Sequence, residues 1–339
     1  MLRARLERCG HFELEDVQVP TPGPDEVLLK VELAGICGSD MHAFHGKHPF
    51  VKPPIVLGHE FSGVIVQLGS RVDKDRHPLG QRVAVEPSIH CGTCYNCKIG
   101  RYNICDELDV VGCLSDGAYA EYIAIRSDKL VPLDESLSFE DGAMLEPLSV
   151  GVHALEQGRV RPGDRVLVLG AGTIGLLLAQ AAEAVGAKAA VADMIDYRLN
   201  VARELGITRP INLVKERLEQ ALAEFAPDGA DVIFECVGSA ETIRQSIAVA
   251  RKGIRIVILG VVDEDVLLPV SLIQDRELEL VGDLMFTRKD FLTAQELIKS
   301  GKVNVRPLQT KIFPLAEVRD AFEYMMNHKQ EALKVFLKP

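Results

Sequence analysis

Four closely spaced cysteines are the first residues of this chain that could do chemistry. They form a C-x-x-C-x-x-C-x₇-C cluster made of Cys91, Cys94, Cys97 and Cys105. Four thiolates at such spacing can make a closed tetrahedral cage, which is the form of a structural zinc site. The alternative is a set of unrelated buried thiols. The regular spacing, together with Gly92, which permits a sharp turn, disfavours that alternative.

A second, sparser set of possible metal ligands mixes thiol, imidazole and carboxylate groups. It consists of Cys37, His59, Glu60 and Glu146. A mixed set can leave one coordination position open, and zinc with an open position lowers the pKa of a water or hydroxyl bound there. A lone histidine or glutamate is usually structural, so residue by residue this set is only weak evidence for a catalytic metal site.

A glycine-rich segment in the middle of the chain has the form of a dinucleotide-binding turn. Gly170, Gly172 and Gly175 match G-x-G-x-x-G, an apolar strand is expected before them, and a helix opens within them. The glycines allow a tight turn, close approach of the pyrophosphate and close helix–strand packing. The alternative is a structural turn that binds nothing, which this context disfavours.

Asp193 ends the next expected strand and would accept hydrogen bonds from the adenosine ribose. Its charge would repel a 2′-phosphate, so we expect NAD rather than NADP. Arg198 could lie over the adenine or be a solvated helix residue. The further candidates for the cofactor site are Thr173, Ile174, Val237, Gly260 and Val261.

The secondary structure expected around these residues changes near residue 150, from mainly strands to alternating strands and helices. Before it, β-rich runs are expected at 27–33, 62–68, 81–85 and 118–125. After it, strands at 165–169, 189–192, 231–236 and 254–259 alternate with helical patterns, which indicates a parallel sheet. Helices are also expected at 290–299 and 315–327. We therefore expect an α/β protein with a mainly β domain at 1–150, a dinucleotide-binding domain at 151–284, and a segment at 285–339 that returns to the first domain.

Composition narrows the class of partner. The 339 residues carry a net charge of −11, which disfavours nucleic acid or an anionic membrane, and also a zinc-ribbon module that binds nucleic acid. The amino end becomes charged before any apolar run forms, and no stretch predicts a membrane span. We expect a cytoplasmic protein with reduced thiols. Cys9 and Cys113 are expected to be packing residues, and Cys236 a small residue near the cofactor.

The order of these motifs resembles the zinc-dependent medium-chain dehydrogenases of the alcohol dehydrogenase family. The similarity covers essentially the whole chain, from C-G-S-D-M-H at 37–42 to L-K-V at 333–335. It implies a GroES-like domain with a structural-zinc lobe at about 88–110 and a Rossmann domain. Glu146 resembles the sorbitol, threonine and sugar-acid dehydrogenase branch, and the run at 48–60 is most similar to bacterial L-galactonate- or L-idonate-type enzymes.

The resemblance also implies residue roles. Cys37 and His59 would be zinc ligands, Glu146 a third ligand directly or through a water, and Glu60 a neighbouring carboxylate or an exchangeable ligand. Ser39 would hold the substrate hydroxyl proton. His42 would continue the relay to solvent through the nicotinamide ribose, unless it is a surface histidine. Asp40 would orient ligands. Two zinc ions per chain and NAD are implied.

The implied reaction is oxidation of a secondary hydroxyl of a sugar acid or polyol to a ketone. The locally basic segment 45–54 could attract an anionic substrate or be a solvated loop, and Phe50 and Tyr119 are candidate pocket walls or core residues. L-Threonine 3-dehydrogenase is the runner-up, and a non-catalytic NAD-binding sensor is the alternative of another class. A homotetramer or homodimer through the cofactor domain is implied by the resemblance alone.

Overall fold

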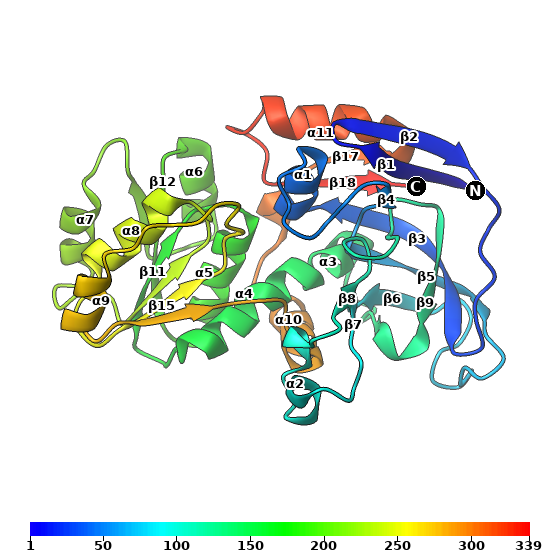
Figure 1. The fold of residues 1–339 in the computed structure, drawn as a ribbon, viewed down its shortest axis with the longest axis horizontal. Helices are drawn as coiled ribbons and strands as arrows, with labels where there is room; N and C mark the ends of the chain where they lie inside the picture. Colours follow the sequence, from blue (N-terminus) through cyan, green and yellow to red (C-terminus); the bar gives the residue numbers. More distant parts are fainter. The chain divides into compact units, whose positions relative to one another are not determined.

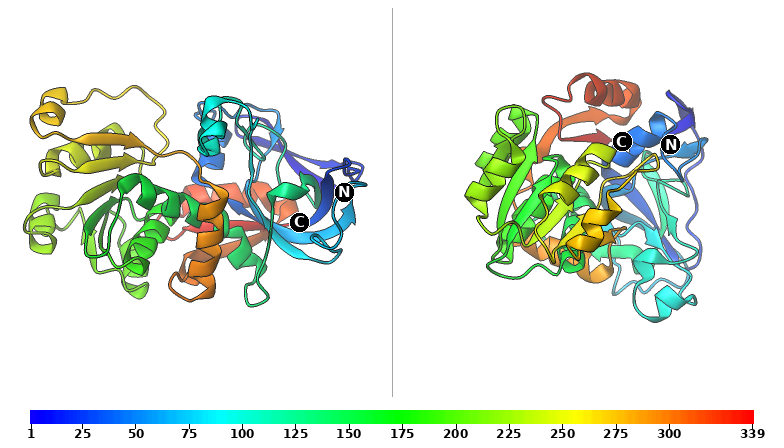
Figure 2. Two further views of the ribbon diagram at one scale, coloured as in Figure 1. Left: turned by 90° about the horizontal axis from the view of Figure 1, so that it is seen from below. Right: turned by 60° about the vertical axis from the view of Figure 1, so that its left-hand side comes forward.

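The computed structural model describes residues 1–339 and contains two compact units. The first unit comprises 1–146, 287–295 and 309–339, and the second comprises 147–286 and 296–308. The expected return of the chain to the first unit is therefore interrupted, because 296–308 belongs to the second. The backbone N–H of Asn304 donates to Oε1 of Gln180 in that unit, at 2.8 Å. Both termini lie in the first unit (Figures 1 and 2).

The first unit is built mainly of β-strands (Figure 1). Its larger sheet has the order β10-β6-β5-β3-β18-β17, with β9 also paired to β3, and its smaller sheet has the order β2-β1-β4. The larger sheet consists of β3 (Glu26–Ile36), β5 (Glu60–Leu68), β6 (Arg82–Val85), β9 (Tyr122–Arg126), β10 (Leu130–Pro132), β17 (Gln309–Pro314) and β18 (Lys334–Lys338). The smaller sheet consists of β1 (Leu2–Arg8), β2 (His11–Asp16) and β4 (Ile55–Val56).

Short helices and one lobe complete the first unit. The lobe is closed by the antiparallel pair β7 (Ser88–Ile89) and β8 (Asp109–Val110) and contains α2 (Tyr95–Lys98) and η1 (Tyr102–Ile104). The other helical elements are α1 (Gly38–Phe44), η2 (Ser127–Lys129), α3 (Phe139–Ala143), η4 (Leu315–Glu317) and α11 (Val318–Asn327). α4 (Leu145–Gly158) and α10 (Arg288–Lys299) each continue from one unit into the other.

The antiparallel pair of β3 and β5 brings the ends of two distant segments together. Gly35 near the end of β3 lies opposite Glu60 at the start of β5. Cys37 follows β3 directly and His59 directly precedes β5, so the register of this one pair places both side chains at the same end of the sheet. Their supporting core is apolar, and it includes the fully buried rings of Phe12, Phe61 and Phe322.

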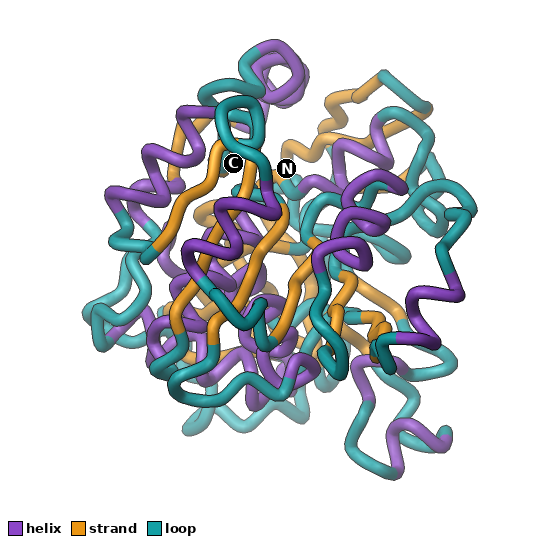
Figure 3. Tube along the Cα trace, turned by 90° about the vertical axis from the view of Figure 1, so that its left-hand side faces the viewer, coloured by secondary structure: helices purple, strands orange, loops and turns teal.

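The second unit is a six-stranded parallel sheet between helices (Figure 3), which confirms the expected α/β class. Its strand order is β13-β12-β11-β14-β15-β16. The strands are β11 (Arg165–Leu169), β12 (Lys188–Asp193), β13 (Arg209–Asn212), β14 (Val232–Glu235), β15 (Arg255–Ile258) and β16 (Glu279–Gly282). The helical elements are α5 (Thr173–Ala184), α6 (Asp196–Glu204), α7 (Leu218–Phe225), α8 (Ala240–Val249), α9 (Val270–Asp275) and η3 (Arg306–Leu308).

This topology fixes where a ligand of the second unit would bind. The chain leaves β11 toward β12 on one side and later returns to β14 on the other, so the strand order reverses between these two neighbours. In open α/β sheets, ligands bind at the carboxyl ends of the strands at such a point. Apolar side chains of α7 and α8 pack on one face of the sheet, including Leu222, Phe225 and Ile247.

Most expected elements are present with shifts of a residue or two at their ends. The strand expected at 118–125 is the main exception, since β9 begins only at Tyr122. The preceding residues bond to another segment: the N–H of Tyr119 donates to the carbonyl of Leu57 at 3.0 Å, and the N–H of Ala118 to that of Gly58 at 2.9 Å. None of the helices combines the length and the apolar character that crossing a membrane requires.

Candidate active site

The four-cysteine lobe has the dimensions of a metal cage. Cys91, Cys94, Cys97 and Cys105 are all free thiols, and their sulfurs lie within 4.8 Å of one another. Neighbouring Sγ atoms are 3.5 to 4.0 Å apart. Zinc–sulfur bonds of about 2.3 Å in a tetrahedron require edges of about 3.8 Å. The residues therefore fit a structural zinc ion.

Backbone N–H groups prepare these sulfurs for that role. The N–H of Cys94 donates to the sulfur of Cys91 at 3.3 Å, and the N–H of Cys97 donates to the sulfur of Cys94 at 3.4 Å. Hydrogen bonds from Thr93, and then from Cys94, lower the pKa of the Cys91 thiol to about 6. Because a thiolate rather than a thiol is the metal ligand, this turn favours the form that binds at Cys91, whereas burial raises the pKa of Cys97 to about 12.

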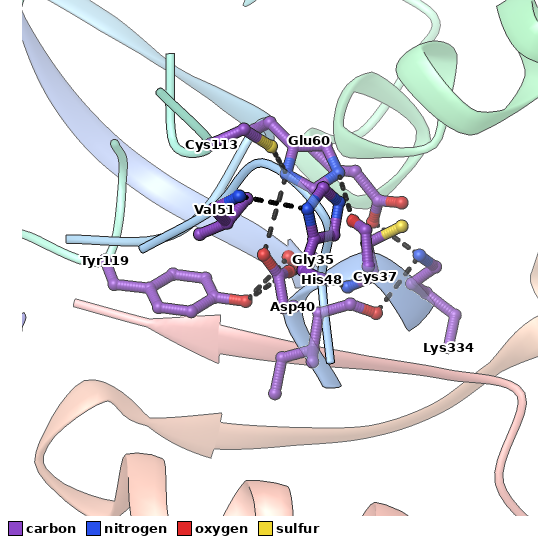
Figure 4. A network of polar contacts seen from close by, with 12 residues as sticks. Gly35, Cys37, Asp40, His48, Val51, Glu60, Cys113, Tyr119 and Lys334 are labelled. Atoms are coloured by element: carbon purple, nitrogen blue, oxygen red, sulfur yellow. Dashed lines mark hydrogen bonds and ion pairs between the residues drawn. The ribbon is translucent and has the colours of Figure 1, made fainter. Parts of the chain in front are cut away.

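The mixed ligand set is assembled at the end of the β3–β5 pair (Figure 4). The ligand atoms of Cys37, His59 and Glu60 lie within 4.8 Å of one another. Cys37 is the residue before α1, and its N–H donates at 2.8 Å to the carboxylate of Asp40 in the first turn of that helix. This local bond fixes the start of the helix and with it the position of the thiol.

His59 is held from both sides of its ring. Nδ1 lies 3.6 Å from Oδ1 of Asp40 and 3.4 Å from the sulfur of Cys113, while Nε2 lies 3.5 Å from Oγ of Ser39. Burial lowers the pKa of His59, but the neighbouring Cys113 and Asp40 outweigh it and raise the pKa well above its ordinary value. A metal bound here would replace that proton.

The two glutamates of this site have different surroundings. Glu60 is completely buried and forms an ion pair with Lys334, while its Oε1 atom has no hydrogen-bond partner. An unpartnered buried carboxylate oxygen beside a thiol and an imidazole fits a cation. Glu146 is also buried but lies outside the group of close ligand atoms. Burial raises its pKa to about 7, because the charge of nearby His59 offsets the burial only in part.

The other residues predicted for the first unit are placed as follows. His42 lies one turn after Ser39 on α1, and its Nδ1 is buried without a partner. Phe50 is 69% exposed, which is compatible with a pocket wall. Tyr119 is fully buried and its hydroxyl donates to Asp40 at 2.9 Å, so of the two alternatives it is a core residue. Cys9 is exposed instead of packed.

Two contributors were not identified from the sequence. Cys113, expected only to pack, lies against His59, and nothing in its local sequence predicts this contact. Lys334 is only 2% exposed and lies between the apolar residues A-L at 332–333 and V-F-L at 335–337. Its ammonium also donates to the carbonyl of Ile36 at 3.2 Å. A lysine in a buried strand requires an anionic partner, which is a signal that the sequence did contain.

The glycine-rich loop of the second unit has the shape that a pyrophosphate requires. Gly170 adopts a φ of +102°, and a Cβ at Gly175 would lie 1.9 Å from the carbonyl oxygen of Gly170. By contrast, a Cβ at Gly172 would meet nothing within 4 Å. Gly172 is the residue before α5 and makes no side-chain cap hydrogen bond, so the helix begins at Thr173 directly beside this turn. The loop fits an anionic group at a helix amino terminus.

The Asp193 carboxylate is hydrogen-bonded to the glycine-rich loop. Its Oδ2 accepts from the N–H of Ala171 at 2.8 Å, and its Oδ1 accepts from the N–H of Ile195 at 2.9 Å. Arg198 approaches the same carboxylate at 3.5 Å. The carboxylate is therefore fixed at the carboxyl end of β12, beside the glycine turn.

The remaining cofactor candidates lie in two loops that touch. A Cβ at Gly260 would lie 2.0 Å from the backbone nitrogen of Gly238, so the chain segments after β14 and β15 pack backbone to backbone. Val237 and Val261 on these segments are exposed apolar residues. The buried carboxylate of Glu235 accepts from the N–H of Val237 at 2.9 Å and from that of Gly238, which fixes the first loop.

Comparison with known proteins agrees with both halves of this arrangement. The alcohol dehydrogenase GroES-like domain family matches residues 23–135, and the zinc-binding dehydrogenase family matches residues 173–300. Sorbitol dehydrogenase of Bacillus subtilis is 35% identical, over 100% of this chain and 97% of its own length. L-Idonate 5-dehydrogenase of Vitis vinifera is 35% identical, over 92% of this chain and 88% of its own length.

A solved structure shows the same fold with a cofactor. An alcohol dehydrogenase from Escherichia coli complexed with NADH is 32% identical, with a TM-score of 0.93, and the match covers 100% of this chain and 99% of that one. The chain belongs to the zinc-type medium-chain alcohol dehydrogenase family. It is an oxidoreductase of the zinc-binding dehydrogenase kind, and zinc and a nicotinamide dinucleotide are its cofactors.

Proposed function

We propose that this enzyme oxidises a secondary hydroxyl of a polyol or sugar acid to a ketone, with NAD as the hydride acceptor. The observation that carries the proposal is the convergence of Cys37, His59 and Glu60 within 4.8 Å, with the Ser39 hydroxyl 3.5 Å from the same imidazole. Three protein ligands would hold a zinc ion here and would leave room for a substrate oxygen, as in catalytic zinc sites.

Cys37 and His59 would hold the catalytic metal together with one carboxylate. Glu60 is the better placed of the two candidates, because it belongs to the close group and carries the unpartnered oxygen. Glu146 is buried nearby in an environment that disfavours its charge, and it would act as an alternative ligand or through a water. Zinc bound there supplies the charge that lowers the pKa of the substrate hydroxyl.

Ser39 and His42 would carry the substrate proton away. They are three residues apart on α1 and therefore lie on the same face of the helix. Ser39 would accept the substrate hydroxyl proton at Oγ while releasing its own hydroxyl proton toward His42. His42, whose Nδ1 is buried and unpartnered, would pass it toward solvent.

The second unit would bind the dinucleotide through backbone and one carboxylate. The N–H groups at the start of α5 would hold the pyrophosphate, and Asp193 would accept the ribose hydroxyls and disfavour a 2′-phosphate. Val237 and Val261 would offer apolar surface to the cofactor. The enzyme is then specific for NAD.

The substrate class rests on relatives and on one loop. Relatives are named for sorbitol, D-xylulose and L-idonate, all polyhydroxylated compounds. The segment 45–54 carries Lys47 and Lys52 in an otherwise acidic chain, which suits an anionic sugar acid. Phe50 on this exposed loop would contact the carbon chain of the substrate.

We further propose that the enzyme is a cytoplasmic homotetramer or homodimer.

The proposed function is tested by measuring NADH and NADPH formation with sorbitol, xylitol, L-idonate, L-galactonate and L-threonine. We expect turnover with polyols or aldonates and NAD. Ser39→Ala and Cys37→Ser should lower kcat by about a hundredfold or more, because each removes a group needed for alkoxide formation. Turnover of threonine alone would identify a threonine 3-dehydrogenase. NAD binding with no turnover and no metal at Cys37 would indicate a sensor instead.

A further inference from the structure

Tyr119 is a fully buried aromatic residue whose polar end is directed at the candidate metal site (Figure 4). Its hydroxyl donates to Oδ2 of Asp40 at 2.9 Å and lies 3.3 Å from the carbonyl oxygen of Gly35. Buried tyrosine hydroxyls that bond to a buried carboxylate fix that carboxylate's orientation. Asp40 is only 1% exposed, and its carboxylate also contacts the N–H of Cys37 and the imidazole of His59.

The two oxygens of Asp40 divide their contacts. Oδ2 accepts from Tyr119 and from the N–H of Cys37, at 2.9 and 2.8 Å. Oδ1 is therefore the oxygen that faces Nδ1 of His59, at 3.6 Å. The imidazole then turns Nε2 to the side where the Ser39 hydroxyl lies, at 3.5 Å. One carboxylate thus connects the phenol to both the thiol and the imidazole of the ligand set.

Tyr119 also supports the backbone that carries His59. Gly58, with a φ of +101°, lies against the tyrosine ring, and a Cβ there would be 2.6 Å from Cδ1 of the ring. The N–H of Tyr119 donates to the carbonyl of Leu57 at 3.0 Å. Tyr119 therefore contacts the two residues before His59 through its main chain and its ring, and it contacts Asp40 through its hydroxyl.

We infer that Tyr119 is a positioning residue of the catalytic metal site, which it orients by holding Asp40 so that His59 presents Nε2 to the metal. The inference rests on the proposed function, in that Cys37 and His59 bind the catalytic zinc. Partners that orient a metal-binding histidine commonly contribute about 10- to 100-fold to metal affinity.

The test is Tyr119→Phe, which keeps the ring under Gly58 and removes only the hydroxyl. Both variant and wild type are titrated against a chelator, and zinc is counted at each site. We expect the affinity of the catalytic site to fall about tenfold or more. The four-cysteine site, which serves as an internal reference, should keep its affinity. Tyr122→Phe, which removes a hydroxyl three residues further on in β9, should leave both sites unchanged.

Two measurements separate positioning from general packing. With Co²⁺ in place of zinc, the visible bands of the catalytic site should shift in Tyr119→Phe, while those of the four-cysteine site stay. In a double-mutant cycle, Tyr119→Phe should add no further loss of metal affinity to Asp40→Asn, because the hydroxyl acts through that carboxylate. Additive losses would overturn the inference.

Two further results would exclude a positioning role for Tyr119. Unchanged metal affinity in Tyr119→Phe would show that the residue only fills the core. Equal losses at both zinc sites would show a general folding role. Either result overturns the inference and leaves the proposed function intact. A wild-type protein that holds only the four-cysteine zinc would overturn the proposed function itself, without reference to any variant.

Discussion

Lys334 and Glu60 form an ion pair that is almost completely closed to solvent, with exposures of 2% and 0%. The two residues come from β18 and β5, on either side of β3, and they meet across Gly35. A Cβ at Gly35 would lie 2.3 Å from the Glu60 carboxylate. The last strand of the chain thus supplies the counter-charge for a carboxylate beside the candidate zinc site.

Removing the Lys334 ammonium should lower the stability of the protein. In the metal-free protein, Lys334→Met leaves Glu60 buried without a cation, and we expect the free energy of unfolding to fall by about 3–5 kcal/mol. Lys334→Met combined with Glu60→Gln should recover most of that loss, because the carboxylate charge that Lys334 neutralises is removed as well. Lys338→Met, on the exposed end of the same strand, is the control. Urea denaturation measures all four proteins, and equal losses in the control and Lys334→Met would contradict the prediction.

Two glycines of the cofactor loop should respond differently to alanine. Gly175→Ala places a Cβ against the carbonyl of Gly170, so we expect a loss of stability of about 1–3 kcal/mol and weaker NAD binding. Gly172→Ala meets no atom of the protein, so its stability should change by less than about 0.5 kcal/mol while NAD binding is lost. Thermal unfolding and NAD titration measure both. Normal NAD affinity in Gly172→Ala would refute the assigned pyrophosphate position.

Asp193 should set the preference between the two dinucleotides. Asp193→Asn keeps an acceptor for the loop but removes the charge that disfavours a 2′-phosphate. We expect the ratio of kcat/KM for NAD to that for NADP to fall by about tenfold or more, because a hydrogen bond to a charged group is replaced by one to a neutral group. Steady-state kinetics with both cofactors measures it. Asp196→Asn, three residues on and bonded to Lys215, is the matched control.

The metal-free protein should lose stability as the pH rises. Burial raises the pKa of Glu146 from 4.5 to about 7, so in that interval the folded state binds more protons than the unfolded state. The raised pKa of His59 acts in the same direction, since its stabilisation is lost as the pH rises through that value. From about pH 5 to about pH 8, Glu146 alone should account for up to roughly 3 kcal/mol.

Urea denaturation of chelator-treated protein at several pH values measures this slope. Glu146→Gln should flatten it, and the exposed Glu135→Gln should not. Zinc should also flatten it, because a bound metal replaces the protons of the site. A slope that Glu146→Gln leaves unchanged would show that this carboxyl is not the group responsible.

Zinc counting should separate the two metal sites. Cys37→Ser should retain one zinc per chain, keep most of the stability and lose activity. Cys94→Ser should also retain one zinc, but it should lower stability, because a structural zinc contributes directly to folding. Elemental analysis with thermal unfolding measures both. Loss of both ions in Cys37→Ser would contradict independent sites. Cys9→Ser, at an exposed thiol far in sequence from either set, is the control.

The sequence by itself determined the features that depend on local geometry. The strand at Arg165–Leu169, the glycine turn and the first turn of α5 lie within one continuous stretch, so glycine positions and an apolar run are enough to predict them. The four cysteines lie within fifteen residues, and their spacing already limits how they can meet. Cys37, His59 and Glu146 were identified as a set only through the resemblance of the whole chain to a family.

The tertiary structure decided what depends on contacts between distant segments. The register of β3 against β5 placed Glu60, and not Glu146, among the close ligand atoms. Lys334 meets Glu60 from 274 residues away, and Tyr119 reaches Asp40 from 79. No local pattern carries such pairings, because a buried charge or hydroxyl finds its partner only when the strands that carry them are packed. Whether Glu60 or Glu146 would face the metal is therefore decided by the tertiary structure.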